Sequence, residues 1–159
     1  MIQKLSNIIT GVPFMTVITS TAFTALETAR VANIPAKEMA KVVVFWMDGA
    51  MNLVVVPSSG RINFELLKAA TKTKEAETAD ESDIKGRFED CVVGAMPPFG
   101  SLFNMKTFVE GSLLEGKNIT FKAGSHTELI TMPVSDFLRL EKPLTGKFLA
   151  DPGKSSAGS

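Results

Sequence analysis

The sequence predicts an α+β fold in which strands and short helices follow one another in mixed order. The clearest signal is a hairpin, because the β-branched and apolar segments Lys41–Met47 and Leu53–Val56 flank the turn residues Asp48 and Gly49. Both segments are apolar at successive positions, so we expect both faces of the sheet to be buried, under helices or in a barrel. A hairpin among irregularly spaced helices indicates α+β rather than a doubly wound fold.

Ahead of the hairpin, capping and turn signals predict mainly helices. Thr24 and Glu27 have the spacing of a capping box, Asn33 suits a helix stop, and Pro35 suits the first turn of a helix. The expected elements are a leader that can hold a short helix, a strand, a helix and a second short helix, at residues 1–13, Met15–Ile18, Ala25–Ala32 and Ala36–Ala40.

Beyond the hairpin, we expect two helices, three strands and a final helix capped by Ser135, at Ile62–Ala70, Asp83–Phe88, Met105–Val109, Ile119–Lys122, Glu128–Met132 and Ser135–Leu140. Thr71–Asp83 is rich in Lys, Thr and Glu, and this composition is typical of a solvated connection with a short strand. Glu128–Met132 is expected to be the last strand of the chain.

The length and composition predict a single domain. The chain has 159 residues, of which 45 % are apolar, so it can form its own core. We assign residues 1–150 to this domain and expect the Gly-, Ser- and Pro-containing residues 151–159 to be a disordered tail. Gly11 and Pro13 interrupt the apolar run near the N-terminus, and no run reaches the length of a membrane span. We therefore expect a cytoplasmic protein with no membrane partner.

The charge and the residue types that bind metals argue against a broad nucleic-acid-binding surface, an intrachain disulfide and a metal site. Seventeen basic residues balance seventeen acidic ones, which disfavours a broad positive field for nucleic acid but permits a local basic patch. One cysteine, Cys91, cannot form an intrachain disulfide, and it is expected to be a small buried apolar residue in a reducing compartment. His126 is the only histidine, and no ligand pair has metal-binding spacing, so we expect neither a metal nor a cofactor.

The segment Cys91–Gly100 is the most informative part of the chain. Two prolines flanked by two glycines form a stiff loop, since proline fixes φ and glycine permits positive φ or close backbone approach. A chain that needs only to turn uses two residues. The segment is therefore interpreted as a loop shaped to hold a ligand, with a rigid turn as the alternative.

Three segments in order carry a resemblance to a known family: Ala40–Phe45 with Asp48-Gly49, Gly94–Pro98 with Gly-x-x-x-Pro spacing, and Phe121–Glu128 with Met132 and Asp136-Phe137. Together they resemble the YbaK/prolyl-tRNA-synthetase-associated domain over roughly residues 14 to 143, and three ordered motifs are more specific than one. The resemblance implies a mixed, strongly curved sheet close to a barrel, with short helices packed around it. It also implies hydrolysis of amino acids from mischarged tRNA.

The resemblance implies catalytic roles for Lys41, Gly94 and His126. Lys41 would bind the tRNA 3′ end and stabilise charge, whereas the residues alone also permit a lysine that extends to the surface. His126 would contact the aminoacyl group or the terminal ribose, with a general-base role as the less favoured alternative. Ser125 is not expected to be a nucleophile beside His126, because neighbours in a strand point to opposite faces.

The loop Gly94–Pro98 is expected to bind the reacting ester. Backbone N–H groups of Gly94, Ala95 and Met96 could donate to the ester oxygen as it becomes negative. Pro97 and Pro98 have no N–H and would shape the loop.

The remaining substrate-binding positions that the resemblance implies are Gly124, Ser125, Ser20 and Asp136. Ser20 stands where several relatives carry His, and Val42 stands where some carry Asn, so the pocket wall differs. Asp136 also suits a helix N-terminus, where the helix dipole favours a carboxylate, and we prefer that structural role.

These expectations describe a hydrolase, namely a trans-editing aminoacyl-tRNA deacylase that acts on a small amino acid, with Ala-, Ser- or Cys-tRNA as substrate types. The expected partner is the 3′ acceptor end of mischarged tRNA, with an aminoacyl-tRNA synthetase as a further candidate. By analogy with the family, the ribose hydroxyl of the substrate would assist the attack. The alternatives are a non-catalytic module that binds a tRNA 3′ end or a nucleotide, and a hydrolase of small free esters.

Overall fold

The computed structural model describes residues 1–88 and 90–151, and its strands form two sheets. The larger sheet has the strand order β4-β2-β3-β5-β8, and the smaller one has the order β1-β7-β6. The strands are β1 (Met15–Ile18), β2 (Ala40–Met47), β3 (Ala50–Pro57), β4 (Ala76–Thr78), β5 (Thr107–Glu110), β6 (Asn118–Lys122), β7 (Glu128–Pro133) and β8 (Leu144–Gly146).

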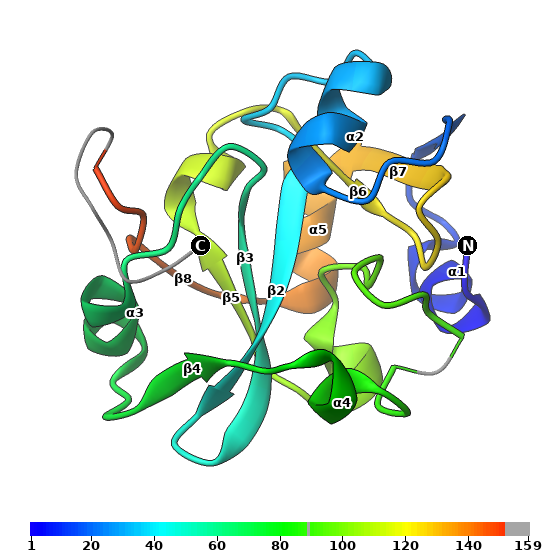
Figure 1. The fold of residues 1–159 in the computed structure, drawn as a ribbon. Helices are drawn as coiled ribbons and strands as arrows, with labels where there is room; N and C mark the ends of the chain where they lie inside the picture. Colours follow the sequence, from blue (N-terminus) through cyan, green and yellow to red (C-terminus); the bar gives the residue numbers. More distant parts are fainter. Residues whose placement is uncertain (89, 152–159) are drawn as a thin grey trace.

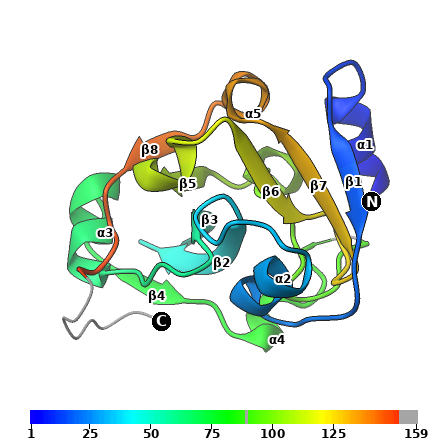
Figure 2. The same ribbon diagram turned by 90° about the horizontal axis from the view of Figure 1, so that it is seen from above.

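Short helices surround the sheets (Figures 1 and 2). They are α1 (Gln3–Ile9), α2 (Ala25–Val31), α3 (Phe64–Thr71), α4 (Glu81–Ile84), α5 (Val134–Glu141) and the 3-10 helices η1 (Gly100–Phe103) and η2 (Gly111–Leu114). In both views α1 and α3 lie at opposite ends of the molecule, and α2 lies beside β2.

The predicted hairpin forms the centre of the larger sheet. Its register pairs Met47 with Ala50, and Asp48 and Gly49 both have positive φ, as a tight hairpin turn between twisted strands requires. Nearly all of β3 is buried, as its run of successive apolar residues predicts. Strands β5 and β8 continue this sheet in parallel.

The main core lies between the sheets, and a smaller cluster fixes α2 at their junction. In the main core the ring of Phe99 packs edge to face against Phe121 and Phe137, with ring centres 5.6 and 5.3 Å apart. Each such pair contributes about 0.5–1.5 kcal/mol beyond the burial of its area. The smaller cluster joins Ala29 of α2 to Met39 and to Leu129 of β7. This packing places the N-terminus of α2 beside β2, where the candidate site lies.

The α+β class is confirmed, but the near-barrel description is not supported. Neither sheet is closed or strongly curled, and the two sheets are joined, within the described residues, by a single bridge between Met39 and Thr120. Strands buried on both faces occur in stacked layers as well as in barrels, so the apolar pattern does not distinguish the two arrangements.

Three local predictions are wrong. The predicted helix Ala36–Ala40 is a turn, because both Glu38 and Met39 donate their N–H to Pro35 O, and β2 then begins at Ala40. Helix α5 begins after Pro133, so Ser135 is not its cap. Strand β8 follows α5, so β7 is not the last strand.

Two further predictions concern the ends of the chain and a membrane. The expected disordered tail, residues 151–159, lies outside the described residues except for Asp151. In the part of the chain that is described, none of the helices combines the length and apolar character that crossing a bilayer requires.

Candidate active site

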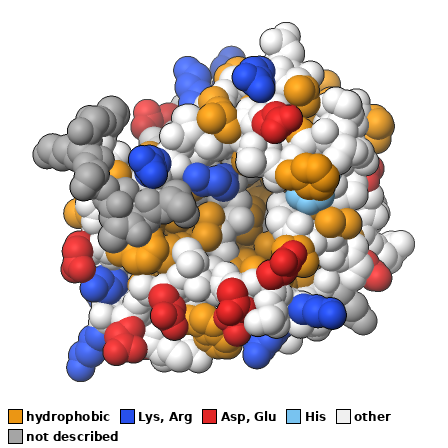
Figure 3. All heavy atoms as spheres, in the orientation of Figure 1, with side chains coloured by type: hydrophobic (Ala, Val, Ile, Leu, Met, Phe, Trp, Pro, Cys, Tyr) orange, Lys and Arg blue, Asp and Glu red, His pale blue; other side chains and the backbone are white. Residues whose placement is uncertain are grey.

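A cavity of about 260 Å³ opens where α2, β2, β6 and the loop after α4 meet, and we call it the cleft. Figure 3 shows this face of the molecule, which is hollowed near its centre and bordered there by hydrophobic side chains. The cleft is lined by Phe23, Thr24, Ala25, Ala40, Lys41, Val42, Val43, Gly94, Met96 and Lys122. All three sequence segments thus meet at the cleft, the first through Lys41, the second through Gly94 and the third through Lys122.

The N-terminus of α2 forms one wall of the cleft. Thr24 caps this helix, since its side chain accepts a hydrogen bond from Glu27 N at 3.1 Å, as the capping pattern predicts. The buried Thr28 hydroxyl donates to Ala22 O and Thr24 O at 3.2 and 2.8 Å. These bonds fix the backbone that carries Phe23 at the edge of the cleft.

Lys41 lies in β2, and its ammonium donates to Gly60 O at 2.8 Å. The side chain is half-buried, and this burial lowers the pKa of Lys41, with a further decrease from the nearby Arg61 charge. No acidic side chain among residues 1–88 and 90–151 forms an ion pair with either cation. Two of the three ammonium hydrogens of Lys41 therefore remain for a ligand.

Lys122 places a second ammonium at the cleft and holds His126. Its Nζ donates to His126 Nδ1 at 2.7 Å, to Ala22 O at 2.9 Å and to Phe23 O at 3.3 Å. Burial lowers the pKa of Lys122 to about 8, although the charge of Glu27 opposes this decrease. All three hydrogens of the ammonium are used inside the protein.

The contacts of His126 define its tautomer. A lysine ammonium cannot accept, so Nδ1 is the acceptor, and Nε2 carries the hydrogen and donates to Val93 O at 3.1 Å. Burial lowers the pKa of His126, and the charge of Lys122 lowers it further, while the bond to Val93 opposes these effects. The imidazole is therefore neutral with both nitrogens engaged, which disfavours the general-base alternative.

The Gly/Pro loop is attached directly to the turn that carries His126. Val92 N donates to Gly124 O at 2.8 Å, and Gly124 N donates to Ala95 O at 2.9 Å. Gly94 has φ +86°, and a Cβ added there would lie 3.4 Å from Cε1 of His126. The positive φ favours glycine at this position, and an added Cβ would also lie at contact distance from the imidazole.

One predicted oxyanion donor is already occupied. Ala95 N donates to Val92 O at 2.9 Å, so this N–H cannot serve the substrate without breaking the turn. Within the described residues, Gly94 N and Met96 N have no hydrogen-bond partner, and both residues line the cleft. The interpretation of the loop as a donor of N–H groups therefore rests on Gly94 and Met96.

The other predicted site residues do not line the cleft. Ala95, Pro97 and Pro98 are buried, and Gly124 uses both of its backbone groups to hold the loop. Ser20 is exposed between β1 and α2, and Ser125 contacts Thr127 through the two hydroxyls at 3.4 Å. Asp136 lies in the first turn of α5 and accepts from Arg139 at 3.0 Å, which supports the structural role that we preferred.

Among the residues that line the cleft, sequence reasoning predicted as site residues only Lys41, Gly94 and Met96. It missed Lys122 and Phe23, which make contacts that shape the cleft. The available signal for Lys122 is a lysine at the end of the predicted strand Ile119–Lys122, four residues before the only histidine. Phe23 gives no signal of its own, because an aromatic residue before a helix cap is as readily a core residue.

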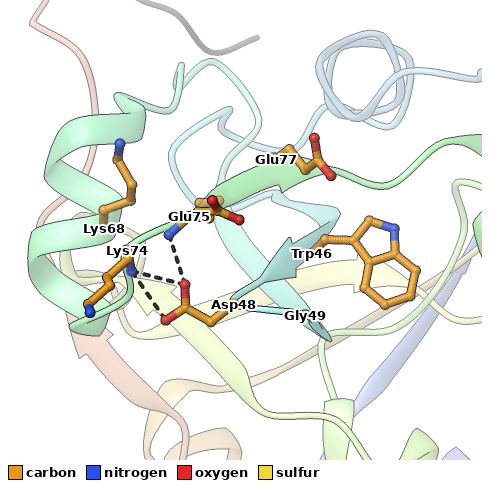
Figure 4. Close-up of a pocket in the computed structure, with 8 residues that line it drawn as sticks. Trp46, Asp48, Gly49, Lys68, Lys74, Glu75 and Glu77 are labelled. Atoms are coloured by element: carbon orange, nitrogen blue, oxygen red, sulfur yellow. Dashed lines mark hydrogen bonds between the residues drawn. The ribbon is translucent and has the colours of Figure 1, made fainter.

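A larger hollow of about 560 Å³ lies at the end of the β2–β3 hairpin (Figure 4). The carboxylate of Asp48 points to the segment that leads into β4. It accepts hydrogen bonds from the backbone N–H groups of Lys74 and Glu75 at 2.8–3.2 Å. These bonds explain the position of Asp48 as part of the turn, and no predicted site residue lines this hollow. We therefore assign the site to the cleft.

The profile of the aminoacyl-tRNA editing domain family matches residues 19–140, a range that includes every residue lining the cleft. The chain belongs to this family. The resemblance to the YbaK family drawn from the three motifs is therefore confirmed. No curated protein matches the sequence.

Solved structures agree with this membership at the level of the fold. The hypothetical protein APE2540 is 19 % identical with a TM-score of 0.81, and the alignment covers 93 % of this editing-domain chain and all of the other. A candidate trans-editing enzyme for prolyl-tRNA synthetase is 15 % identical with a TM-score of 0.78, covering 94 % and 96 % of the two chains. A computationally designed epitope scaffold has the same fold, with 14 % identity, a TM-score of 0.77 and coverage of 95 % and 99 %.

Proposed function

We propose that this editing-domain protein is an aminoacyl-tRNA deacylase that hydrolyses the ester of a mischarged aminoacyl-tRNA in trans. The observation that carries the proposal is the convergence of Lys41, Gly94 and His126 within the region that matches the family: the first two line one cleft, and His126 lies against Gly94. The cleft volume of about 260 Å³ is below the range of roughly 300–1,000 Å³ that encloses drug-sized ligands. Its size favours a small amino acid, such as Ala, Ser or Cys.

The chemistry requires stabilisation of a developing oxyanion. Water adds to the ester carbonyl carbon, and the carbonyl oxygen takes negative charge that the N–H groups of Gly94 and Met96 are placed to receive. One such donor typically contributes about 3–4 kcal/mol in the transition state. The C–O bond to the ribose then breaks, and the ribose oxygen takes the proton that the attacking water has lost. The adjacent ribose hydroxyl of the substrate assists the attack in this proposal, since His126 has no free nitrogen.

Lys41 supplies positive charge next to the reacting ester. With two unused ammonium hydrogens and Arg61 nearby, it suits a phosphate of the tRNA 3′ end. The tRNA acceptor end is thus the proposed partner, and an aminoacyl-tRNA synthetase is a further one. We place the activity in the cytoplasm and in one domain, residues 1–150.

A specific observation also favours a second candidate, the non-catalytic module that binds a tRNA end. Both nitrogens of His126 are occupied, and among the described residues the cleft is lined by no carboxylate or free imidazole. The cations at this cleft suit binding of a tRNA end, and binding does not require hydrolysis of the ester.

Deacylation of labelled Ala-, Ser- and Cys-tRNA tests the proposal. We expect ester loss with the wild type and a decrease in rate of about 100-fold or more for Lys41→Ala, comparable to the loss of an oxyanion contact. Lys37→Ala is the matched control, since Lys37 is an exposed lysine outside the cleft, and its rate should equal that of the wild type. Tight binding without ester loss supports the binding module, and absence of both contradicts the proposal.

A further inference from the structure

Phe23 is more exposed than any other aromatic side chain that the structure describes, with 73 % of its surface accessible. Its position at the rim of the cleft makes this exposure informative. Val92 and Val93 are also exposed, at 51 % and 39 %, and Val93 O accepts the hydrogen bond of His126, whose ring contacts Phe23. Burying a phenylalanine contributes about 1.5–3 kcal/mol, so an apolar rim left open is a candidate contact surface.

The position of Phe23 is fixed by hydrogen bonds to its backbone and by a ring contact with His126. The carbonyl of Phe23 accepts from Lys122, and the carbonyl of the preceding Ala22 accepts from the same ammonium. The ring itself packs against His126 with centres 5.2 Å apart and planes inclined at 64°. An aromatic ring that is exposed yet fixed at its backbone and on one side is preorganised for a partner, because little freedom remains to be lost on binding.

The size of the cleft indicates what that partner is. Its floor contains Ala40 and Met96, which are buried, whereas Phe23 lies at its mouth. A cavity of about 260 Å³ is too small to enclose a whole aminoacylated nucleoside, given the roughly 300–1,000 Å³ typical of drug-sized ligands. If the ester and its amino acid occupy the cavity beside Gly94, the base of the same nucleotide has to lie outside it, at the rim.

We propose that Phe23 is a stacking platform for the base of the 3′-terminal nucleotide, with Val92 and Val93 as its apolar border. The proposal rests on the proposed function, because the ester defines which nucleotide reaches the rim. Stacking of a base on an aromatic ring depends on the π-face rather than on base edges, so this subsite grips the end of the strand without reading its sequence.

Binding of two short RNA probes tests the platform. The first is the trinucleotide CCA, and the second is the same strand with an abasic terminal ribose. We expect Phe23→Leu to weaken CCA binding by about 5- to 150-fold, the range for loss of one base stack, and to leave the abasic probe unchanged. Phe23→Trp should retain CCA binding. Ile18→Ala is the control, since Ile18 is equally exposed at 73 % but does not line the cleft.

The outcomes separate this inference from the proposed function. Unchanged CCA binding by Phe23→Leu, an equal loss for both probes, or no CCA binding by the wild type each overturns the platform. If the wild type binds CCA more tightly than the abasic probe but hydrolyses no aminoacyl-tRNA, deacylation fails while the platform stands. If it hydrolyses aminoacyl-tRNA and Phe23→Leu changes neither binding nor rate, the platform alone fails.

Discussion

At the scale of single residues, Lys122 connects three parts of the site that are far apart in the sequence. One ammonium binds the Ala22–Phe23 backbone, which is 99 to 100 residues away, and His126 on the adjoining turn. A buried charge is unfavourable unless it is hydrogen-bonded, and here every hydrogen of the ammonium has a partner. Lys122 therefore positions Phe23 and fixes the tautomer of His126.

The lowered pKa of Lys122 predicts how stability depends on pH. The pKa is about 8 in the folded protein against a model value of 10.5, so between these values the unfolded chain holds more protons and the free energy of unfolding rises with pH. The shift corresponds to a rise of roughly 3 kcal/mol across the window. Urea unfolding at pH 7.5 and pH 10.5 measures this rise, with Lys122→Met as the variant that lacks the group.

The comparison with Lys122→Met isolates one titration, because the adjacent imidazole is already neutral throughout this window. Burial lowers the pKa of His126, and the charge of Lys122 lowers it further. We therefore expect the free energy of unfolding of the wild type to rise relative to that of Lys122→Met as the pH is raised from 7.5 to 10.5. A difference independent of pH would show that Lys122 keeps its ordinary pKa.

The residues that sequence reasoning could find are those within motifs. Lys41, Gly94 and His126 come together in the structure because each belongs to one of three ordered segments. The role of Phe23 and the bonds from Lys122 to the Ala22–Phe23 backbone escaped because these contacts span about a hundred residues, which no local pattern encodes. The spacing of Lys122 and His126 was the one local signal. Ala95 was wrongly expected to be a free donor, since its bond to Val92 O is set by the turn of the loop.

At the scale of elements, two helices carry the same kind of cap but differ in their relation to the cleft. Thr24 caps α2 and also lines the cleft, whereas Asn63 caps α3 by accepting from Leu66 N at 3.0 Å, away from it. A matched pair of substitutions can therefore separate stability from activity.

We expect Thr24→Ala and Asn63→Ala each to lower the free energy of unfolding by about 1 kcal/mol, the usual value of an N-cap. Only Thr24→Ala should also reduce kcat/KM for aminoacyl-tRNA, by up to about 100-fold, since it loosens the wall that holds the substrate. Chemical denaturation and steady-state deacylation measure the two effects. Equal activity of both variants would show that the start of α2 does not position the substrate.

The elements that were mispredicted share a physical cause. Pro35 suits the first turn of a helix, but the chain forms only one turn after it before β2 pairs with β3 from Ala40 onward. Strand β8 is short and mostly exposed, and it forms through parallel pairing with β5, so its sequence carries no alternating pattern. Tertiary pairing decided both segments.

At the scale of the whole molecule, the sequence could predict the class of the fold but not how its sheets are arranged. The hairpin and the mixed order of helices and strands indicate α+β, and the structure has this class. Whether strands buried on both faces form one curved sheet or two depends on edge pairing. In this chain the described sheets meet through a single bridge at Met39 and Thr120, where their cores join.

The balanced net charge of the molecule predicts a weak salt dependence for tRNA binding. Each phosphate contact to a single strand contributes about −0.7 to the slope of log affinity against log salt. Lys41 and Arg61 are the cations placed to contact phosphate, because the hydrogens of Lys122 are used internally. Two contacts give a slope of about −1.4. Measurement of tRNA affinity from 50 to 300 mM KCl, roughly the range in which such slopes are resolved, tests this value.

Arg61→Ala should make the slope shallower by about 0.7, and Lys37→Ala should leave it unchanged. A slope near −5 in the wild type would instead mean that tRNA is held by a broad basic surface, which a chain with seventeen positive and seventeen negative side chains does not suggest.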